Sequence, residues 1–362
     1  MKQAFTMVEL IFVIVILAIL SMFGADLYTK IYQSYVHARA INQLEDRTQN
    51  ALNIIYSKLE DRIQGSVIGR NHAIAYEKNI VPITEVEGTD NVLEWIPQSV
   101  ESRYVIGEAG TGIGSFGWTG YTTNQYFGKP NFVVDGTNLY VVTPGSKIND
   151  AAAIIKKLRA TCKTKACKNA ADSDFAVLFR LEDPFVGLSE ANTYYGYNGK
   201  TDRENRSAIY TAEVSDKTVS KSGTLTAGSP NDMFKIIDGF DSTISTVADR
   251  YYLAHTAYAI VPTNAAGDIV TSKDIGLTIQ GVAVENFNLT LKYNYRPWKG
   301  EKYTDTGAGK TIKSALLAED VSVFRFKQDD ANLRLQICLR DNGRNFDPEK
   351  LDLIICKNQV VF

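Results

Sequence analysis

The residue types that most often carry catalysis are scattered along this chain of 362 residues. Its three histidines, His37, His72 and His255, lie far apart, which argues against a histidine-rich metal enzyme. No serine stands in the G-x-S-x-G pattern of a nucleophile elbow. Residues 112–117 match the G-x-G-x-x-G fingerprint of dinucleotide-binding proteins, but no helical pattern follows them, so a glycine-rich turn is the preferred interpretation. We therefore expect no catalytic residues and a protein that is not an enzyme.

The loop DNGRNFDPEK carries side-chain oxygens of the kind that calcium, a hard cation, prefers. Asp341, Asn342, Asn345 and Asp347 supply these oxygens. The loop lacks the glutamate that closes an EF-hand, and its glycine and proline are typical of a turn. A solvated turn is the preferred interpretation, and a calcium site at Asp341, Asn345 and Asp347 is the alternative. We expect no other metal or cofactor.

Glu9 is the only charged residue in the apolar run over residues 5–25. As a helix this run is about 31 Å long, enough to cross the hydrocarbon core of a bilayer. A secretory signal peptide is disfavoured because only Lys2 precedes the run and no clean cleavage site follows it. A carboxylate inside a membrane helix is costly and indicates a function. The alternative is a plain signal anchor in which the glutamate is incidental.

This N-terminus resembles the class III signal of type IV prepilins and type II secretion pseudopilins. Ala4 occupies the small position before the cleavage site, Phe5 is the aromatic residue that becomes the new N-terminus, and Glu9 is the fifth residue counted from Phe5. The remaining positions of the motif match as well: Thr6, Met7, Val8 and the apolar run 10–20. The family usually has glycine where this chain has Ala4.

The resemblance implies that prepilin peptidase cleaves between Ala4 and Phe5 and methylates the new amine of Phe5. The subunit would wait in the bacterial inner membrane as a single-pass protein with a periplasmic body. Lys2 would lie on the cytoplasmic side. An inner-membrane assembly platform would then extract it into a filament of pilin or pseudopilin subunits. Glu9 would neutralise the Phe5 amine of a neighbouring subunit, which offsets the cost of a carboxylate in a low dielectric.

A second resemblance lies near the C-terminus, in the stretch LAEDVSVFRFKQDDANLRLQICLRD. Leu317, Val321, Phe324 and Phe326 occupy the apolar places that precede the closing strands of large minor pilins and J-type minor pseudopilins. The presence of Glu9 argues against the K-type tip subunit, which lacks that acid. The length of the chain argues against a major filament subunit.

The residues of the N-terminal motif need a long helix to position them, and the sequence pattern predicts one helix over residues 5–63. The stretch contains no proline, and glycine and serine follow it. Apolar residues recur at steps of three and four along one face. They are Leu27, Ile31, Tyr35, Ala38, Ile41, Leu44, Thr48, Leu52, Ile55, Leu59 and Ile63. The stripe is too short and irregular for a coiled-coil stalk, so we expect it to pack onto the body.

The remainder of the chain favours a β-rich body. The whole chain is 44% hydrophobic, and its many tyrosines and phenylalanines suit strands. Candidate strands are 66–68, 73–77, 91–96, 103–106, 139–143, 175–181, 208–214, 257–261, 282–295, 321–327, 333–340, 351–356 and 359–362. One internal helix is expected over 151–160, capped by Asp150. Polar, loop-rich stretches are expected over 162–171 and 193–206.

The fold class that we expect is therefore α+β and pilin-like: a long N-terminal helix and a mainly antiparallel β body. The expected organisation is a leader 1–4, a transmembrane and filament-core helix 5–25, a helical stem 26–65, and a periplasmic body 66–362 with a loop-rich insertion over about 144–235.

The four cysteines can be paired by strand parity once the body is placed outside the cytoplasm, where disulfides persist. Cys338 and Cys356 each face away from the apolar residues of their own strand, and the intervening loop can return the chain antiparallel. This favours a Cys338–Cys356 disulfide and leaves Cys162 with Cys167. A four-cysteine zinc site is the alternative, although the spacing of Cys162 and Cys167 is wide for zinc.

Two functions remain open at this point. The first is a minor pilin or pseudopilin that primes, terminates or caps a filament in pilus assembly, secretion or DNA uptake. Its partners would be prepilin peptidase, other subunits, the assembly platform and the membrane. No direct contact with nucleic acid is expected, because the net charge is −2. The second is a periplasmic ligand-binding or enzymatic domain held by an uncleaved signal anchor.

Overall fold

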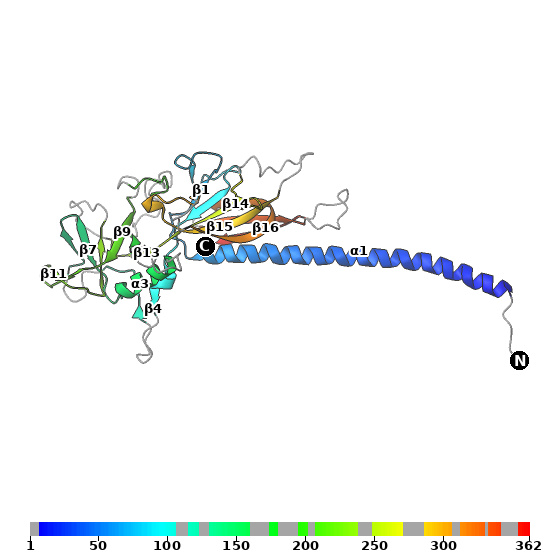
Figure 1. Cartoon of the computed structure of the whole chain (residues 1–362), viewed down its shortest axis with the longest axis horizontal. Helices are drawn as coiled ribbons and strands as arrows, with labels where there is room; N and C mark the ends of the chain where they lie inside the picture. The colour runs from blue at the N-terminus through cyan, green and yellow to red at the C-terminus, as the bar shows by residue number, and fades with distance from the viewer. Residues whose placement is uncertain are drawn as a thin grey trace.

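A single long helix and a β-rich body make up the computed structural model (Figure 1). The structure describes residues 7–105, 115–122, 130–159, 174–179, 195–201, 207–237, 248–270, 286–305, 312–329, 332–341 and 354–362. Within these residues every strand pair is antiparallel. The described chain is therefore an α+β protein, as the sequence predicts.

Helix α1, Met7–Glu60, has 54 residues and is about 81 Å long. Its side chains are exposed from Met7 to Tyr35, and the first buried one is Leu44. The helix ends three residues earlier than predicted. Arg62 donates its backbone N–H to Leu59 O, and Gly65 has a positive φ of 84° that turns the chain toward the first strand. Figure 1 shows the N-terminal half of α1 extending far from the body.

The first sheet has eight strands in the order β18-β17-β16-β15-β14-β3-β1-β2. The strands are β1 Ile68–Arg70, β2 Ile80–Pro82, β3 Val92–Trp95, β14 Ala257–Thr263, β15 Phe287–Tyr295, β16 Lys313–Asp329, β17 Asn332–Arg340 and β18 Ile354–Val361. The C-terminal strand β18 forms one edge of this sheet, beside the helix.

The docked half of α1 and one face of this sheet share the largest core cluster. Leu44, Leu52, Ile55 and Leu59 supply the helical side of the cluster. The sheet side includes alternate residues of β17, because every second side chain of a strand points to the same face. Complete burial of each aliphatic side chain contributes about 1.5–3 kcal/mol.

The second sheet has six strands in the order β13-β8-β9-β12-β7-β6 and lies between β3 and β14 in the sequence. Its strands are β6 Phe132–Asp135, β7 Asn138–Val142, β8 Phe175–Phe179, β9 Ile209–Val214, β12 Met233–Ile236 and β13 Tyr251–Ala254. Helix α3, Ile148–Arg159, packs on it through Ile148, Ala151, Ala152 and Ile155. Figure 1 places this sheet, in green, on the side of the body away from the N-terminus.

Two short helices and two two-stranded sheets complete the described body. They are α2 Val100–Arg103, the 3-10 helix η3 Pro297–Lys299, the pair β4 Tyr104–Val105 and β5 Ser115–Phe116, and the pair β10 Lys217–Val219 and β11 Leu225–Ala227. The expected loop-rich insertion over 144–235 thus supplies α3, β8 to β11 and most of β12. Its strands β8, β9 and β12 find partners in the second sheet, and β10 pairs with β11. Residues 195–201 lie within the expected 193–206 loop, whereas the 162–171 loop lies outside the described residues.

Several local predictions need correction. Residues 73–77 form turns rather than a strand, because Tyr76 turns inward and places its ring over Arg70. Asp150 lies inside α3 rather than at its cap, since the helix already begins at the buried Ile148. The strand predicted over 321–327 extends in β16 to 313–329, and the last two predicted strands form one strand, β18. The strands that the sequence did not indicate are β2, β5, β6 and β10 to β13.

Candidate functional site

The first candidate site is the exposed N-terminal half of α1. Glu9 lies in the first turn of the described helix, and large apolar side chains follow it on every side. Within the described residues, α1 is the one helix that is long and apolar enough to span a membrane. The cleavage positions Ala4 and Phe5 lie outside the described residues. The structure therefore contains the acid and its apolar surroundings and leaves the expected processing site untested.

The second candidate site is the pair of closing strands. A disulfide joins Cys338 of β17 to Cys356 of β18, which face each other in the strand register. This is the pair that strand parity predicts. The other two cysteines, Cys162 and Cys167, lie outside the described residues.

The expected calcium loop begins where β17 ends. Asp341 directly follows β17, whereas Asn342, Asn345 and Asp347 lie outside the described residues. Among the residues that the structure describes, no group of three or more His, Cys, Asp or Glu side chains is placed to hold a metal ion. The geometry therefore offers no described ligand set for calcium or zinc.

The end of the helix is joined to the end of the chain. The Arg62 guanidinium donates to Leu59 O at 3.1 Å, to Phe362 O at 3.2 Å and to Val361 O at 3.5 Å. Further along the same contact, Lys357 Nζ donates to Gln49 Oε1 at 3.3 Å. Thus β18 is bonded to α1 at Gln49, and the C-terminal end of the chain is bonded to the turn after α1 at Arg62.

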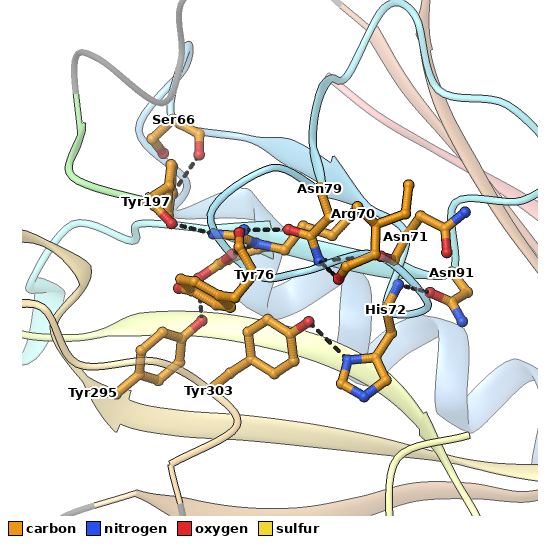
Figure 2. A network of polar contacts seen from close by, with 12 residues as sticks. Ser66, Arg70, Asn71, His72, Tyr76, Asn79, Asn91, Tyr197, Tyr295 and Tyr303 are labelled. Atoms are coloured by element: carbon orange, nitrogen blue, oxygen red, sulfur yellow. Dashed lines mark hydrogen bonds and ion pairs between the residues drawn. The ribbon is translucent and has the colours of Figure 1, made fainter. Parts of the chain in front are cut away.

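A buried arginine connects four segments of the body (Figure 2). Arg70 of β1 is fully buried and donates Nε to Glu94 Oε2 of β3 at 2.5 Å. Its remaining donors reach Tyr76 O at 2.9 Å, Asn79 Oδ1 at 2.7 Å and Tyr197 O at 2.7 Å. Because a buried guanidinium is costly unless all of its donors are satisfied, this cluster favours a single arrangement of these segments.

The charge of this pair is maintained by its surroundings. Burial alone would lower the pKa of Arg70, but the adjacent Glu94 carboxylate and nearby tyrosine rings raise its pKa, so the guanidinium stays charged. Burial raises the pKa of Glu94, while Arg70 and the Tyr295 hydroxyl, which donates to Glu94 Oε1 at 2.8 Å, act to lower it. Figure 2 shows Tyr76, Tyr295 and Tyr303 beside Arg70. The pair is enclosed, so its role is to hold the body together.

His255 and Ser99 form a second buried polar pair. His255 Nδ1 lies 2.8 Å from Ser99 Oγ, a distance at which a serine and a general base can exchange a proton. Ser99 is fully buried, and its hydroxyl also accepts from Ser102 Oγ at 2.8 Å. A substrate cannot reach this hydroxyl. The pair therefore stabilises the link between β13 and β14, and His255 is a satisfied core residue.

Neither of the other two histidines belongs to a group of three or more His, Cys, Asp or Glu side chains that could hold a metal ion in the described part of the chain. His72 is half-buried, and its Nδ1 lies 3.3 Å from Tyr303 Oη at the margin of the Arg70 cluster. His37 lies on α1, N-terminal to the docked half that begins at Leu44. In the G-x-G-x-x-G segment, Ser115 and Phe116 belong to β5, and the described residues 117–122 contain no helix, while Gly112 and Gly114 lie outside the described residues.

An open groove of about 710 Å³ lies between the loop after β2 and the ends of β16, β17 and β18. Its walls mix charges of both signs, with Glu87 and Asp90 on the loop and Arg325, Lys327 and Arg334 on the strands. Sequence reasoning did not indicate this groove, because its walls come from segments more than 200 residues apart.

The chain matches no family model, no curated protein and no solved structure.

Proposed function

We propose that the protein is a minor type IV pilin or type II secretion pseudopilin, most similar to the large J-type subunits. Its work is assembly and contact, and it performs no catalysis. What supports the proposal is the contrast between the two halves of α1. The half up to Tyr35 is exposed, apolar up to Ala25 and carries Glu9, whereas the half from Leu44 is docked on an antiparallel sheet.

An apolar surface of this size is not sustained in water. The segment suits two environments in turn: the hydrocarbon of the bilayer and the core of a bundle of similar helices. The α1 helix passes from the apolar half to the docked half without a break, so a subunit can move from one environment to the other without refolding its body.

Glu9 distinguishes these two environments. A carboxylate in hydrocarbon without a cationic partner is costly, and the amine of a neighbouring Phe5 offers that partner in a filament. On this proposal the subunit waits in the inner membrane with its body in the periplasm. Prepilin peptidase, the assembly platform and other subunits are its partners.

Processing gives the direct test. The mature protein, purified from its native membranes, should lack residues 1–4 and carry one methyl group on the amine of Phe5. Intact-mass and N-terminal peptide mass spectrometry measure both changes. A protein that keeps Met1 in cells with an active prepilin peptidase would overturn the proposal.

Substitution of Glu9 tests the assembly step. The Glu9→Ala variant should be cleaved and inserted normally, because the body and the apolar run are unchanged, but its incorporation into filaments should fall about tenfold or more once the charge pair is lost. Glu9→Asp should be intermediate, since the charge remains and the reach is shorter. Glu45→Ala, which removes an exposed acid from the same helix, is the control and should assemble normally. Immunoblots of sheared filaments measure the yield, and normal yield of Glu9→Ala would contradict the pairing.

A second candidate function is an anchored periplasmic binding domain, and the groove beside Glu87 and Arg325 is the observation that favours it. This alternative predicts an uncleaved N-terminus. The mass spectrometry experiment therefore separates the two functions.

A further inference from the structure

Four residues that follow the apolar run of α1, Asp26, Tyr28, Lys30 and Tyr32, form a short amphipathic segment that we call the collar. Asp26 and Lys30 form an ion pair at 2.9 Å, one helical turn apart. Tyr28 and Tyr32 stack on one another with ring centroids 6.4 Å apart and planes inclined by 13°. Both rings are largely exposed, Tyr28 at 70% and Tyr32 at 58%, so within the described chain nothing covers them.

The length of the apolar run places this collar at the edge of a bilayer. Residues 5–25 span the hydrocarbon core, and the headgroup layer on each side is about 5–7 Å thick. At 1.5 Å per residue, Tyr28 Cα lies about 4–5 Å beyond Ala25 and Tyr32 Cα about 10 Å beyond it. Helical side chains lean toward the N-terminus, which brings the Tyr32 ring back toward the headgroups.

The chemistry of the collar suits that layer. A tyrosine has an apolar ring and a hydroxyl that needs water or a polar partner, so it is enriched where hydrocarbon meets water. The ion pair adds no net charge but supplies donors and acceptors at the same depth. The body begins further out, because Leu44 lies about 28 Å beyond Ala25. The headgroup layer is therefore within reach of the collar while the sheet is not.

We propose that Tyr28 and Tyr32, together with the Asp26–Lys30 pair, bind the lipid headgroup layer and set the depth at which α1 sits in the membrane. The inference rests on the membrane-spanning part of the proposed function and is independent of cleavage and filament formation. It gives the waiting subunit a fixed depth, so that the same length of helix is presented to the assembly partners in every copy.

The test reads the depth of three positions in vesicles of phosphatidylethanolamine and phosphatidylglycerol. The full-length protein is reconstituted as the single variants Tyr28→Trp, Tyr32→Trp and Tyr35→Trp. Tyr35 is the matched control, because it is the same residue type, is 62% exposed and lies about 15 Å beyond Ala25, outside the headgroup layer. Lipid carrying a headgroup spin label and aqueous acrylamide serve as the two quenchers. The three native tryptophans are buried, and their signal is subtracted with the unsubstituted protein.

We expect the headgroup label to quench Tyr28→Trp and Tyr32→Trp about twofold more strongly than Tyr35→Trp, and acrylamide to show the reverse order. Equal quenching at all three positions would overturn the proposal. A second measurement uses Phe23→Trp as the reporter of depth. Its quenching should shift when Tyr28→Ala and Tyr32→Ala are combined and should stay constant with Tyr35→Ala, and an unchanged profile in both backgrounds would also overturn it. Vesicle flotation separates the failures: protein that does not float contradicts the membrane anchor itself, whereas floating protein with uniform quenching contradicts the collar alone.

Discussion

His255 shows how one buried side chain makes the stability of this fold depend on pH. Its ring lies in the link between β13 and β14, and Ser99 is its hydrogen-bond partner. Burial lowers the pKa of His255 to about 4, with Glu101 acting to raise it and Arg159 acting to lower it. The folded protein therefore keeps this ring neutral at a pH where the unfolded chain takes up a proton.

The stability that His255 contributes should be present above pH 6.5 and be lost as the pH falls from 6.5 toward 4. In that window the unfolded state binds a proton that the folded state does not, which costs up to about 3 kcal/mol of unfolding free energy. Urea unfolding at a series of pH values measures the effect. The His255→Gln variant, which cannot titrate, should lose less stability than the parent across this window. Parallel curves for the two proteins would show that His255 is not the group responsible.

The Cys338–Cys356 disulfide closes a loop of 18 residues between the last two strands. Loss of this constraint in a Cys338→Ala/Cys356→Ala variant should lower the free energy of unfolding by about 3 kcal/mol, chiefly because the unfolded chain becomes freer. Denaturant unfolding of the oxidised protein measures the change. Non-reducing peptide mapping is the independent check: a peptide joining Cys162 to Cys356, or four free thiols, would show that the strand-parity pairing is wrong. A Cys162→Ala/Cys167→Ala variant is the control, and its shorter loop should contribute less.

At the level of elements, α1 is one helix with two kinds of surface. The sequence predicts a single apolar stripe from Leu27 to Ile63, and the structure buries that stripe only from Leu44. The pattern shows which face is apolar but not what covers it. Only the C-terminal part of the helix meets the sheet, so Leu27, Ile31 and Tyr35 stay exposed in the described chain.

A leucine-to-alanine substitution should destabilise the fold in the docked half of α1 and have little effect on its stability in the exposed half. Leu52→Ala, at a fully buried position, should cost about 2–5 kcal/mol of unfolding free energy because it leaves a cavity beneath the sheet. Leu27→Ala, at a position that is 60% exposed, should change it by less than about 0.5 kcal/mol. Tryptophan fluorescence during denaturant unfolding of the full chain in detergent reports both, since Trp95 lies in the same cluster as Leu52. Equal losses in the two variants would contradict the division of the helix.

At the level of the whole molecule, the sequence predicts the first sheet better than the second. The closing strands are long and alternate cleanly, so their register and the Cys338–Cys356 pairing follow from a period of two. The second sheet is built from strands of four to six residues spread between residues 132 and 254, and their pairing depends on non-local contacts. Short apolar runs of this kind do not indicate their partners.

The buried polar contacts between segments also could not be predicted from the sequence pattern. Arg70 and Glu94 are charged residues in short apolar strands, which indicates an inward-facing pair. The sequence does not indicate which groups accept from each donor of Arg70. At the junction of the two sheets, Asp174 lies 3.3 Å from Arg296 and also contacts Lys299. Such contacts fix how the second sheet is held on the first, and only the folded chain shows them.

The attachment of β18 to α1 gives the molecule a defined mechanical axis. From Gln49 to its last residue, Glu60, the helix advances about 17 Å, and from Lys357 to Val361 the strand advances about 14 Å in the same direction. Tension applied at the membrane end of α1 therefore shears the contact between α1 and β18. The bonds of this contact then resist the load together instead of breaking one after another. The disulfide then passes the load covalently from β18 to β17. In single-molecule pulling between the N-terminus and the body, the rupture force should fall when this disulfide is reduced, and an unchanged force would place the load path elsewhere.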